Sequence, residues 1–355
     1  MFQAGYILNR RDDWIWFLGL PFVAVAFAVG ADYWLPFATL AAVHLWVTVP
    51  HHWATWLRTY GHRPDLERFY LRLFLGPILI SALVLTGAVY APLTLFLVIR
   101  LWDTQHGLMQ QHGFGRIYDV KAGTGVALTG RFDLGLNAVL YINMLIASPL
   151  FTQTFWVPAL YKFGVVVSAE QIASFQQVCW TITLGYCAIY AGHLLWCVAN
   201  GHRLNPVKYG FLISSYFLWY YTAWHTNSVL VWGIAHRLMH GLQYIVMVHS
   251  YMQRAGEKAE GPPRGAARLF ERGQLHWFLG SAVMYAVAYQ LLMDGSLADF
   301  GFGFAPSGSG GASAETIPLV TQIRVVLVAE SFQLVHFYFD SFIWRLSDPR
   351  VREGL

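Results

Sequence analysis

The segment ESFQLVHFYFDSFIWRLSDPR, from Glu330 to Arg350, combines a run of aromatic and aliphatic residues with a few polar ones. Phe, Val, Leu and Ile dominate it, which predicts a helix in apolar surroundings. The polar side chains inside this run are Glu330, Gln333, His336 and Asp340. Burying such groups is costly unless something binds them, so the segment predicts a membrane helix that carries part of a binding site.

The composition of the whole chain is that of a membrane protein. Of 355 residues, 56% are hydrophobic and 12% are charged, whereas soluble domains carry about 25% charged residues. We therefore predict an all-α polytopic transmembrane bundle that forms a single domain over residues 1–355. Apolar runs of spanning length predict about ten spans: 14–32, 34–57, 69–90, 92–115, 134–151, 175–199, 208–226, 228–251, 275–293 and 319–343.

The positions of Lys and Arg predict the orientation of these spans. Outside the spans, all basic residues except Lys162 fall on one side, which the positive-inside rule assigns to the cytoplasm. Both termini and a basic loop over 252–274 are then cytoplasmic, and a Gly/Ser-rich loop over 294–318 lies outside. The net charge of +4 follows from this topology, so no nucleic-acid partner is expected. The predicted location is a bacterial inner (cytoplasmic) membrane, with membrane lipids as partners.

Five histidines on five predicted spans lie at a similar depth. At about 1.5 Å per residue, this layer is roughly 10 to 20 Å inside the cytoplasmic boundary. Imidazole is the commonest metal ligand, and one helix of a bundle offers only one or two ligands, so a shared depth favours a metal or cofactor site. The five are His51, His106, His193, His240 and His336.

Helical spacing indicates which of these side chains can face a common point, since residues three and four apart share a face. One such face carries His336 and Asp340, a second His236, His240 and Gln243, and a third His106 and Gln110. His51 shares a face with His44, Thr48 and Thr55, with His52 displaced and Pro50 breaking the helix locally. His44, His225, His249 and His276 are better explained as packing residues. His193 is open between the two interpretations, and His236 is either a second ligand or a neighbour of Arg237.

The predicted site divides into three roles. Glu330 and Asp340 are the candidate catalytic carboxylates, and Gln110 and Gln243 are expected to orient ligands. Arg237 is predicted to clamp an anionic group of a cofactor or, like Arg100 and Arg324, to form an ion pair. The candidate metal ligands are His51, His106, His193, His236, His240, His336 and Asp340.

Imidazole and carboxylate ligands without thiolates favour non-haem iron, as one ion or two, with zinc or copper also possible. In its histidine-rich membrane site the chain resembles, in type, the integral-membrane non-haem iron oxygenases, the desaturases and hydroxylases. The segment HRLMH (236–240) matches their HxxxH pattern. This resemblance implies oxygen-dependent attack on a lipid-like or other apolar substrate, with electrons supplied from the cytoplasm. No GxGxxG follows a strand pattern, so a separate electron donor is expected.

Two other classes of protein remain open. Two of these histidines on facing helices would ligate b-type haem, with arginines holding its propionates. A proton-coupled transporter would use His, Asp and Glu as a relay.

Overall fold

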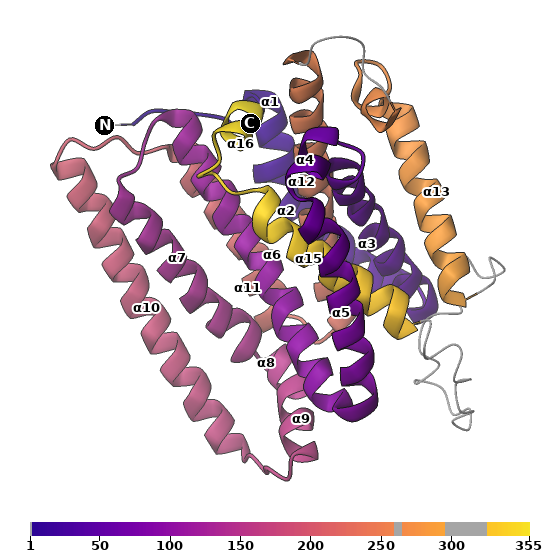
Figure 1. Cartoon of the computed structure of the whole chain (residues 1–355). Helices are drawn as coiled ribbons and strands as arrows, with labels where there is room; N and C mark the ends of the chain where they lie inside the picture. The colour runs from indigo at the N-terminus through magenta and orange to yellow at the C-terminus, as the bar shows by residue number, and fades with distance from the viewer. Residues whose placement is uncertain (1, 259–264, 295–324) are drawn as a thin grey trace. The chain divides into compact units, whose positions relative to one another are not determined.

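The computed structural model describes residues 2–258, 265–294 and 325–355 (Figure 1). These residues form helices throughout, with one isolated bridge between Phe2 and Leu204 and no other strand pairing among them. The all-α prediction is confirmed. The predicted outer loop over 294–318 lies, beyond Asp294, outside the described residues, as does Arg324.

The chain divides into two compact units. Unit 1 comprises Met1–Tyr33 and Thr104–His240, and unit 2 comprises Trp34–Asp103 and Gly241–Leu355. Both inner boundaries fall inside long helices, α6 (Pro92–Ala122) and α12 (Val229–Lys258). For this reason no linker composition marks them in the sequence. A single domain over the whole chain remains a prediction.

Unit 1 begins with one continuous helical stretch formed by α1 (Arg10–Asp13), the π-helix η1 (Trp14–Gly19) and α2 (Leu20–Trp34). It continues through α7 (Ala127–Tyr141), α10 (Ala169–Ala199) and α11 (Pro206–Trp224), with α10 packed along α7 (Figure 1). Shorter elements join α7 to α10, and these are η2 (Ile142–Ile146), α8 (Pro149–Phe151), η3 (Thr152–Trp156) and α9 (Val157–Lys162).

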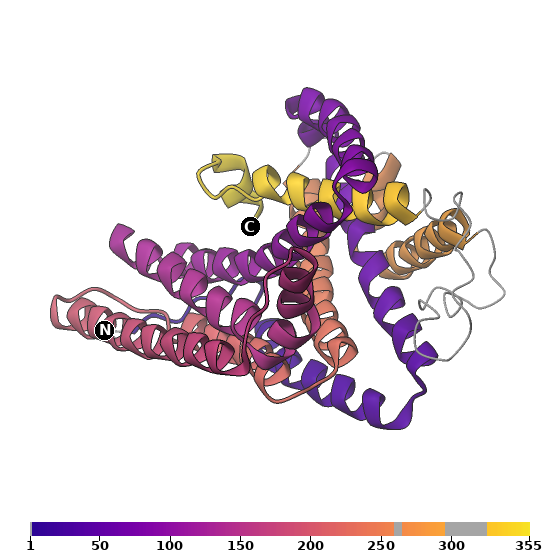
Figure 2. The same ribbon diagram turned by 90° about the horizontal axis from the view of Figure 1, so that it is seen from below.

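Unit 2 contains the segment quoted at the start of the sequence analysis, as α15 (Ser331–Ile343) preceded by the π-helix η6 (Val325–Glu330). Figure 2 shows α15 next to α3 (Phe37–Thr59) and α5 (Tyr70–Tyr90), and it contacts both. The approach to α5 is close because a Cβ at Gly76 would overlap the Tyr338 ring. The remaining elements are α4 (Arg63–Arg68), η4 (Gly265–Phe270), α13 (Leu275–Asp294), which packs along α3, and α16 (Pro349–Gly354).

Only some of these helices are long and apolar enough to cross a membrane. Three described helices meet that test, Arg10–Trp34, Tyr70–Tyr90 and Ala169–Ala199. The bent pair Ala127–Ile146 and Pro149–Lys162 adds a fourth if it forms one span. Helices lie over the described part of each predicted span, but ten membrane crossings are not confirmed. Helices such as α6 fall short because polar residues, among them Arg100, Asp103 and Gln110, interrupt the apolar run. The apolar helices support association with a membrane.

The segment predicted as a basic loop over 252–274 begins later than expected, because α12 continues to Lys258. Its residues MQRAGEK are mostly strong helix formers, which extend the helix past its apolar part. The sequence prediction placed the helix end where hydrophobicity falls. That criterion marks the edge of an apolar environment, and backbone helicity continues beyond it.

A buried group of charged residues joins three helices of unit 1. Lys208 at the start of α11 is fully buried, and its Nζ lies 2.7 Å from Asp119 Oδ2 on α6 and 2.7 Å from Asp133 Oδ2 on α7. Arg116 Nη1 lies 2.7 Å from the same Asp119 oxygen, and Tyr190 on α10 donates to Asp133 Oδ1 at 2.7 Å. Two cations and two carboxylates therefore balance each other where α6, α7 and α11 meet.

Candidate metal centre

Two adjacent histidines on α3 start the site in unit 2. His51 and His52 are both buried and follow Pro50, which lies inside the helix. The Nδ1 atom of His51 is hydrogen-bonded to the backbone carbonyl oxygen of Thr48. Because a carbonyl oxygen only accepts, Nδ1 carries the proton, which leaves Nε2 as the metal-binding atom of the neutral ring.

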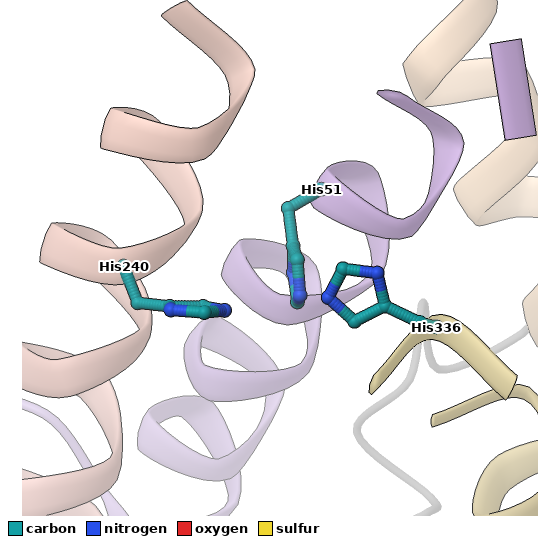
Figure 3. A group of neighbouring side chains, drawn as sticks. All are labelled: His51, His240 and His336. Carbon is teal, nitrogen blue, oxygen red and sulfur yellow. The ribbon is translucent and has the colours of Figure 1, made fainter. Parts of the chain in front are cut away.

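A third imidazole reaches this pair from α15. The His336 ring centroid lies 4.8 Å from that of His51 and 5.0 Å from that of His52, and the His51 and His52 centroids are 4.4 Å apart. His51 and His336 are drawn in Figure 3, where their rings approach each other from α3 and α15. One ring nitrogen of His51 lies within 4.8 Å of a ring nitrogen of His336. The structure thus places these two predicted ligands close together, and their role as ligands stays a prediction.

Four side chains of unit 2 form a continuous hydrogen-bond chain. His336 Nδ1 lies 2.7 Å from Thr55 Oγ1, and Thr55 Oγ1 lies 2.8 Å from the Tyr244 hydroxyl oxygen. The Tyr244 hydroxyl in turn donates to Asp340 Oδ1 at 2.7 Å. The chain joins α3, α12 and α15, and its members Thr55, Tyr244 and His336 are buried.

Counting protons along this chain fixes its direction. An ionised Asp340 only accepts, so the single hydroxyl proton of Tyr244 goes to Asp340. Thr55 must then donate its own proton to Tyr244, and Thr55 Oγ1 accepts from His336 Nδ1. The neutral His336 therefore carries its proton on Nδ1, and its lone pair is on Nε2. Metal-bound histidines usually have their second nitrogen held in this way, which orients the ring and sets its tautomer.

Asp340 places a carboxylate next to that lone pair. Its Oδ2 atom lies 3.7 Å from His336 Nε2, and its side chain is 9% exposed. Two ligands bound to one metal at about 2.0 to 2.1 Å are separated by about 3 to 4 Å for common coordination angles. The pair therefore fits a single metal ion with one ligand from each residue. His51 is the next imidazole of unit 2, with its ring centroid 4.8 Å from that of His336.

The end of α15 is held by a buried arginine. Arg58 on α3 donates from Nη2 to the Ile343 carbonyl oxygen at 2.6 Å, and its guanidinium lies 3.5 Å from the Trp344 ring centroid and 4.0 Å from that of Tyr251. Donation to a terminal carbonyl satisfies a group that the helix itself leaves without a partner. Arg58 thereby fixes the end of α15 against α3, the helix that carries His51.

Unit 1 contains a second group of histidines. The His240 ring centroid on α12 lies 5.1 Å from that of His106 on α6 and 5.3 Å from that of His236. His236 also packs on Trp219, at 4.4 Å between centroids, and beside Gly107, where a Cβ would lie 2.5 Å from its Nε2. These three residues are all among the predicted metal ligands, and that role stays a prediction. Gln110 donates to the His240 backbone carbonyl at 3.1 Å, so this contact is with the main chain and not with an imidazole.

His193 lies in surroundings typical of a packing residue. Its Nε2 lies 3.0 Å from Thr129 Oγ1, and its ring stacks on Phe132 with centroids 4.2 Å apart. We therefore leave it out of the proposed ligand set. His225, which lies 2.8 Å from the Tyr220 hydroxyl, and His249, whose ring packs on Phe278, have contacts that agree with the packing role assigned to them.

Glu330 lies beside an arginine of the same unit. It ends η6, and its Oε1 atom is 3.8 Å from Arg100 Nη2, while Arg100 Nη1 is 3.9 Å from Asp103 Oδ2. These distances agree with the ion-pair interpretation of Arg100. Gln243 and Arg237 are both buried on α12. The catalytic role of Glu330 and the cofactor roles of Gln243 and Arg237 stay predictions.

Sequence reasoning missed two members of the unit 2 cluster. His52 was placed off the predicted face, and Tyr244 was not considered. The adjacent pair His51 and His52 after a proline was an available signal, because a proline distorts the helix and changes where nearby side chains point. Tyr244 follows His240 by one helical turn, which was a second signal.

Comparison with protein-family models, with curated proteins and with solved structures finds no match. The function must therefore be argued from the chemistry of the site. The convergence of all the predicted ligands, from His51 to Asp340, on one point stays a prediction.

Proposed function

We propose that the protein is a membrane-embedded, metal-dependent oxidoreductase of the oxygenase, hydroxylase or desaturase type. The observation that carries this proposal is the pair of His336 and Asp340, 3.7 Å apart, with the buried ring of His51 next to His336. The hydrogen bonds that run from His336 through Thr55 and Tyr244 to Asp340 hold the His336 ring with Nε2 toward the Asp340 carboxylate. Such a constellation is expensive to bury in an apolar protein unless it binds something.

Non-haem iron is the metal that this ligand chemistry favours, because two imidazoles and one carboxylate are the ligand types of non-haem Fe(II) oxygenases. Bound there, iron would supply oxygen-dependent oxidation of an unactivated carbon. His51, His336 and Asp340 would hold it, and Thr55 and Tyr244 would keep His336 and Asp340 oriented. The apolar cluster beside them, built on Phe339, Val335 and Leu73, supports an apolar or lipid-like substrate.

The proposed setting is a bacterial inner membrane with both termini in the cytoplasm. It follows from the distribution of Lys and Arg and is supported by the apolar helices of both units. A separate cytoplasmic protein would supply electrons.

Metal analysis of the purified protein tests the proposal. We expect iron in the wild-type protein and a loss of at least about tenfold in a folded His336→Asn variant, because even residues that only support a ligand change metal affinity by 10 to 100-fold. The matched control is His276→Asn, which removes an exposed histidine of α13 in the same unit. Equal metal content in both variants would refute the site.

An optical spectrum distinguishes this proposal from the haem alternative, since b-type haem gives an intense Soret band and a non-haem iron centre does not. Haem ligation requires only two histidines and leaves the hydrogen-bonded Asp340 without a role. A proton-coupled transporter, the other alternative, would show uptake into vesicles that does not depend on metal.

A further inference from the structure

A cavity of about 680 Å³ lies in unit 2, away from the histidine cluster. It is formed where α4 ends, where α5 begins and where α15 leads into α16. Three arginines line it, Arg68, Arg72 and Arg345, together with two acidic residues, Glu67 and Asp348. Nothing in the proposed oxidoreductase chemistry uses these side chains.

Both acidic residues of the cavity already have an arginine partner. Glu67 Oε1 lies 2.6 Å from Arg63 Nε, and Asp348 pairs with Arg68. Among the described residues, no carboxylate lies within salt-bridge distance of Arg72 or Arg345. Arg72 stands over the Phe342 ring at 5.4 Å, and Arg345 donates from Nε to the Ser341 carbonyl at 3.3 Å. The cavity thus presents two cations whose charge is not balanced by a described neighbour.

The cavity lies at one end of a candidate membrane span. α5 begins at Tyr70 and, beyond Arg72 near its start, is largely apolar. Its outward residues are strongly exposed, with Leu71 at 74%, Leu75 at 52% and Ile78 at 65%. Arginines and an exposed tyrosine at the start of such a helix are typical of the level of lipid headgroups. The helix start also favours a negative charge through its dipole.

We propose that this cavity binds the phosphate of an anionic phospholipid headgroup, held by Arg72 and Arg345. Guanidinium groups match phosphate geometry and remain charged at any physiological pH. A free phosphate offers the same chemistry to the arginines. The lipid is favoured because the exposed apolar face of α5 continues from the cavity and would cover its acyl chains. Binding there would anchor α15, the helix that carries His336, to the membrane surface.

Lipid binding to the full-length protein in detergent tests this assignment, using native mass spectrometry with phosphatidylglycerol, phosphatidylcholine and, separately, inorganic phosphate. Each arginine near an anionic lipid contributes about a fivefold factor in affinity, so the double variant Arg72→Gln/Arg345→Gln should bind phosphatidylglycerol about 30-fold more weakly. The control Arg352→Gln removes an exposed arginine of α16 that does not line the cavity and should bind like the wild type. Arg72→Lys/Arg345→Lys, which keeps the charges, should retain most of the binding. The charge-state distribution of the double Gln variant in the same native mass spectra checks that this variant is folded.

Two results would overturn the proposal. One is equal binding of phosphatidylglycerol and phosphatidylcholine by the wild type, because a phosphocholine headgroup carries no net charge. The other is competition by inorganic phosphate at the affinity of the lipid itself, which would make the cavity a site for soluble anions. Neither result bears on the metal content of the His336→Asn variant, so the two proposals fail independently.

Discussion

Replacing Thr55 by Val should weaken metal binding without any change to a proposed ligand. Valine has nearly the shape of threonine but lacks the hydroxyl that stands between His336 Nδ1, at 2.7 Å, and Tyr244, at 2.8 Å. The change leaves the buried Nδ1–H of His336 without its acceptor. Leaving such a group unsatisfied costs about 1 to 3 kcal/mol, and exchanging the tautomer to avoid that cost places the proton on the metal-binding nitrogen.

That cost corresponds to a fall in metal affinity of about 10 to 100-fold, the range measured for partners that orient metal-bound histidines. Isothermal titration of the metal-free protein in detergent with ferrous iron or zinc would measure it. The matched control is Thr59→Val, one turn further along α3. Thr59 is equally buried, but its hydroxyl donates to the Thr55 carbonyl, so this variant removes a buried hydroxyl that does not touch His336.

Thr55→Ser keeps a hydroxyl at the same place and should restore most of the affinity. If Thr55→Val and Thr59→Val bind metal equally well, the proton count along the chain is wrong, and His336 is not oriented by Thr55. A loss of affinity in both variants would indicate a general effect of loosening α3.

Three other perturbations test separate parts of the structure. Asp340→Asn keeps the side-chain shape and removes the charge, so metal occupancy or turnover should fall by about 10 to 100-fold in a folded protein, and full metal content with full activity would remove Asp340 from the site. Lys208→Met leaves two buried carboxylates, Asp119 and Asp133, against one cation, Arg116, and should destabilise unit 1 by about 3 to 5 kcal/mol in detergent unfolding. Burial already raises the pKa of Asp119 above its ordinary value of 3.8 while Lys208 opposes this, so the folded variant binds a proton more tightly than the unfolded chain. Its stability should fall as the pH rises from the ordinary aspartate pKa through the raised pKa of Asp119, and a pH-independent loss would contradict this reasoning. Cysteines introduced at Gly261 and Ser307 should be labelled from opposite sides of the membrane, and labelling of both from one side would refute the predicted topology.

The positions of the helices were accessible from the sequence because apolar runs and their breaks are local features. The ten-span count was not, since length and hydrophobicity cannot separate a lipid-facing helix from one that is apolar because it is buried in protein. α12 illustrates this: much of its length between Val231 and Met252 is buried, while α5 is mostly exposed. The division into two units was also inaccessible, because it depends on which helices pack together and its boundaries fall inside α6 and α12.

The candidate site was predictable to the extent that helical periodicity determines it. His336 and Asp340 are four residues apart on one helix, so their proximity follows from geometry alone. The proximity of His51 and His336 was expected because both lie at the same predicted depth in their spans. The inclusion of His52 and Tyr244 was not predictable in this way, because it depends on the rotation of α3 after Pro50 and on how α12 packs beside α15. Spacing within one helix says nothing about either.

The polar residues of the segment from Glu330 to Arg350 divide between two kinds of contact. Inside the helix, His336 and Asp340 are joined to each other through Thr55 and Tyr244, and Glu330 lies near Arg100. Beyond it, Arg345 lines the proposed lipid cavity and Asp348 pairs with Arg68. Between the two groups, Arg58 holds the end of α15 at Ile343. Because a helix is stiff over this length, fixing its end also fixes the position and rotation of His336 and Asp340. The arginines at one end therefore help to determine the geometry of the proposed metal ligands further along α15.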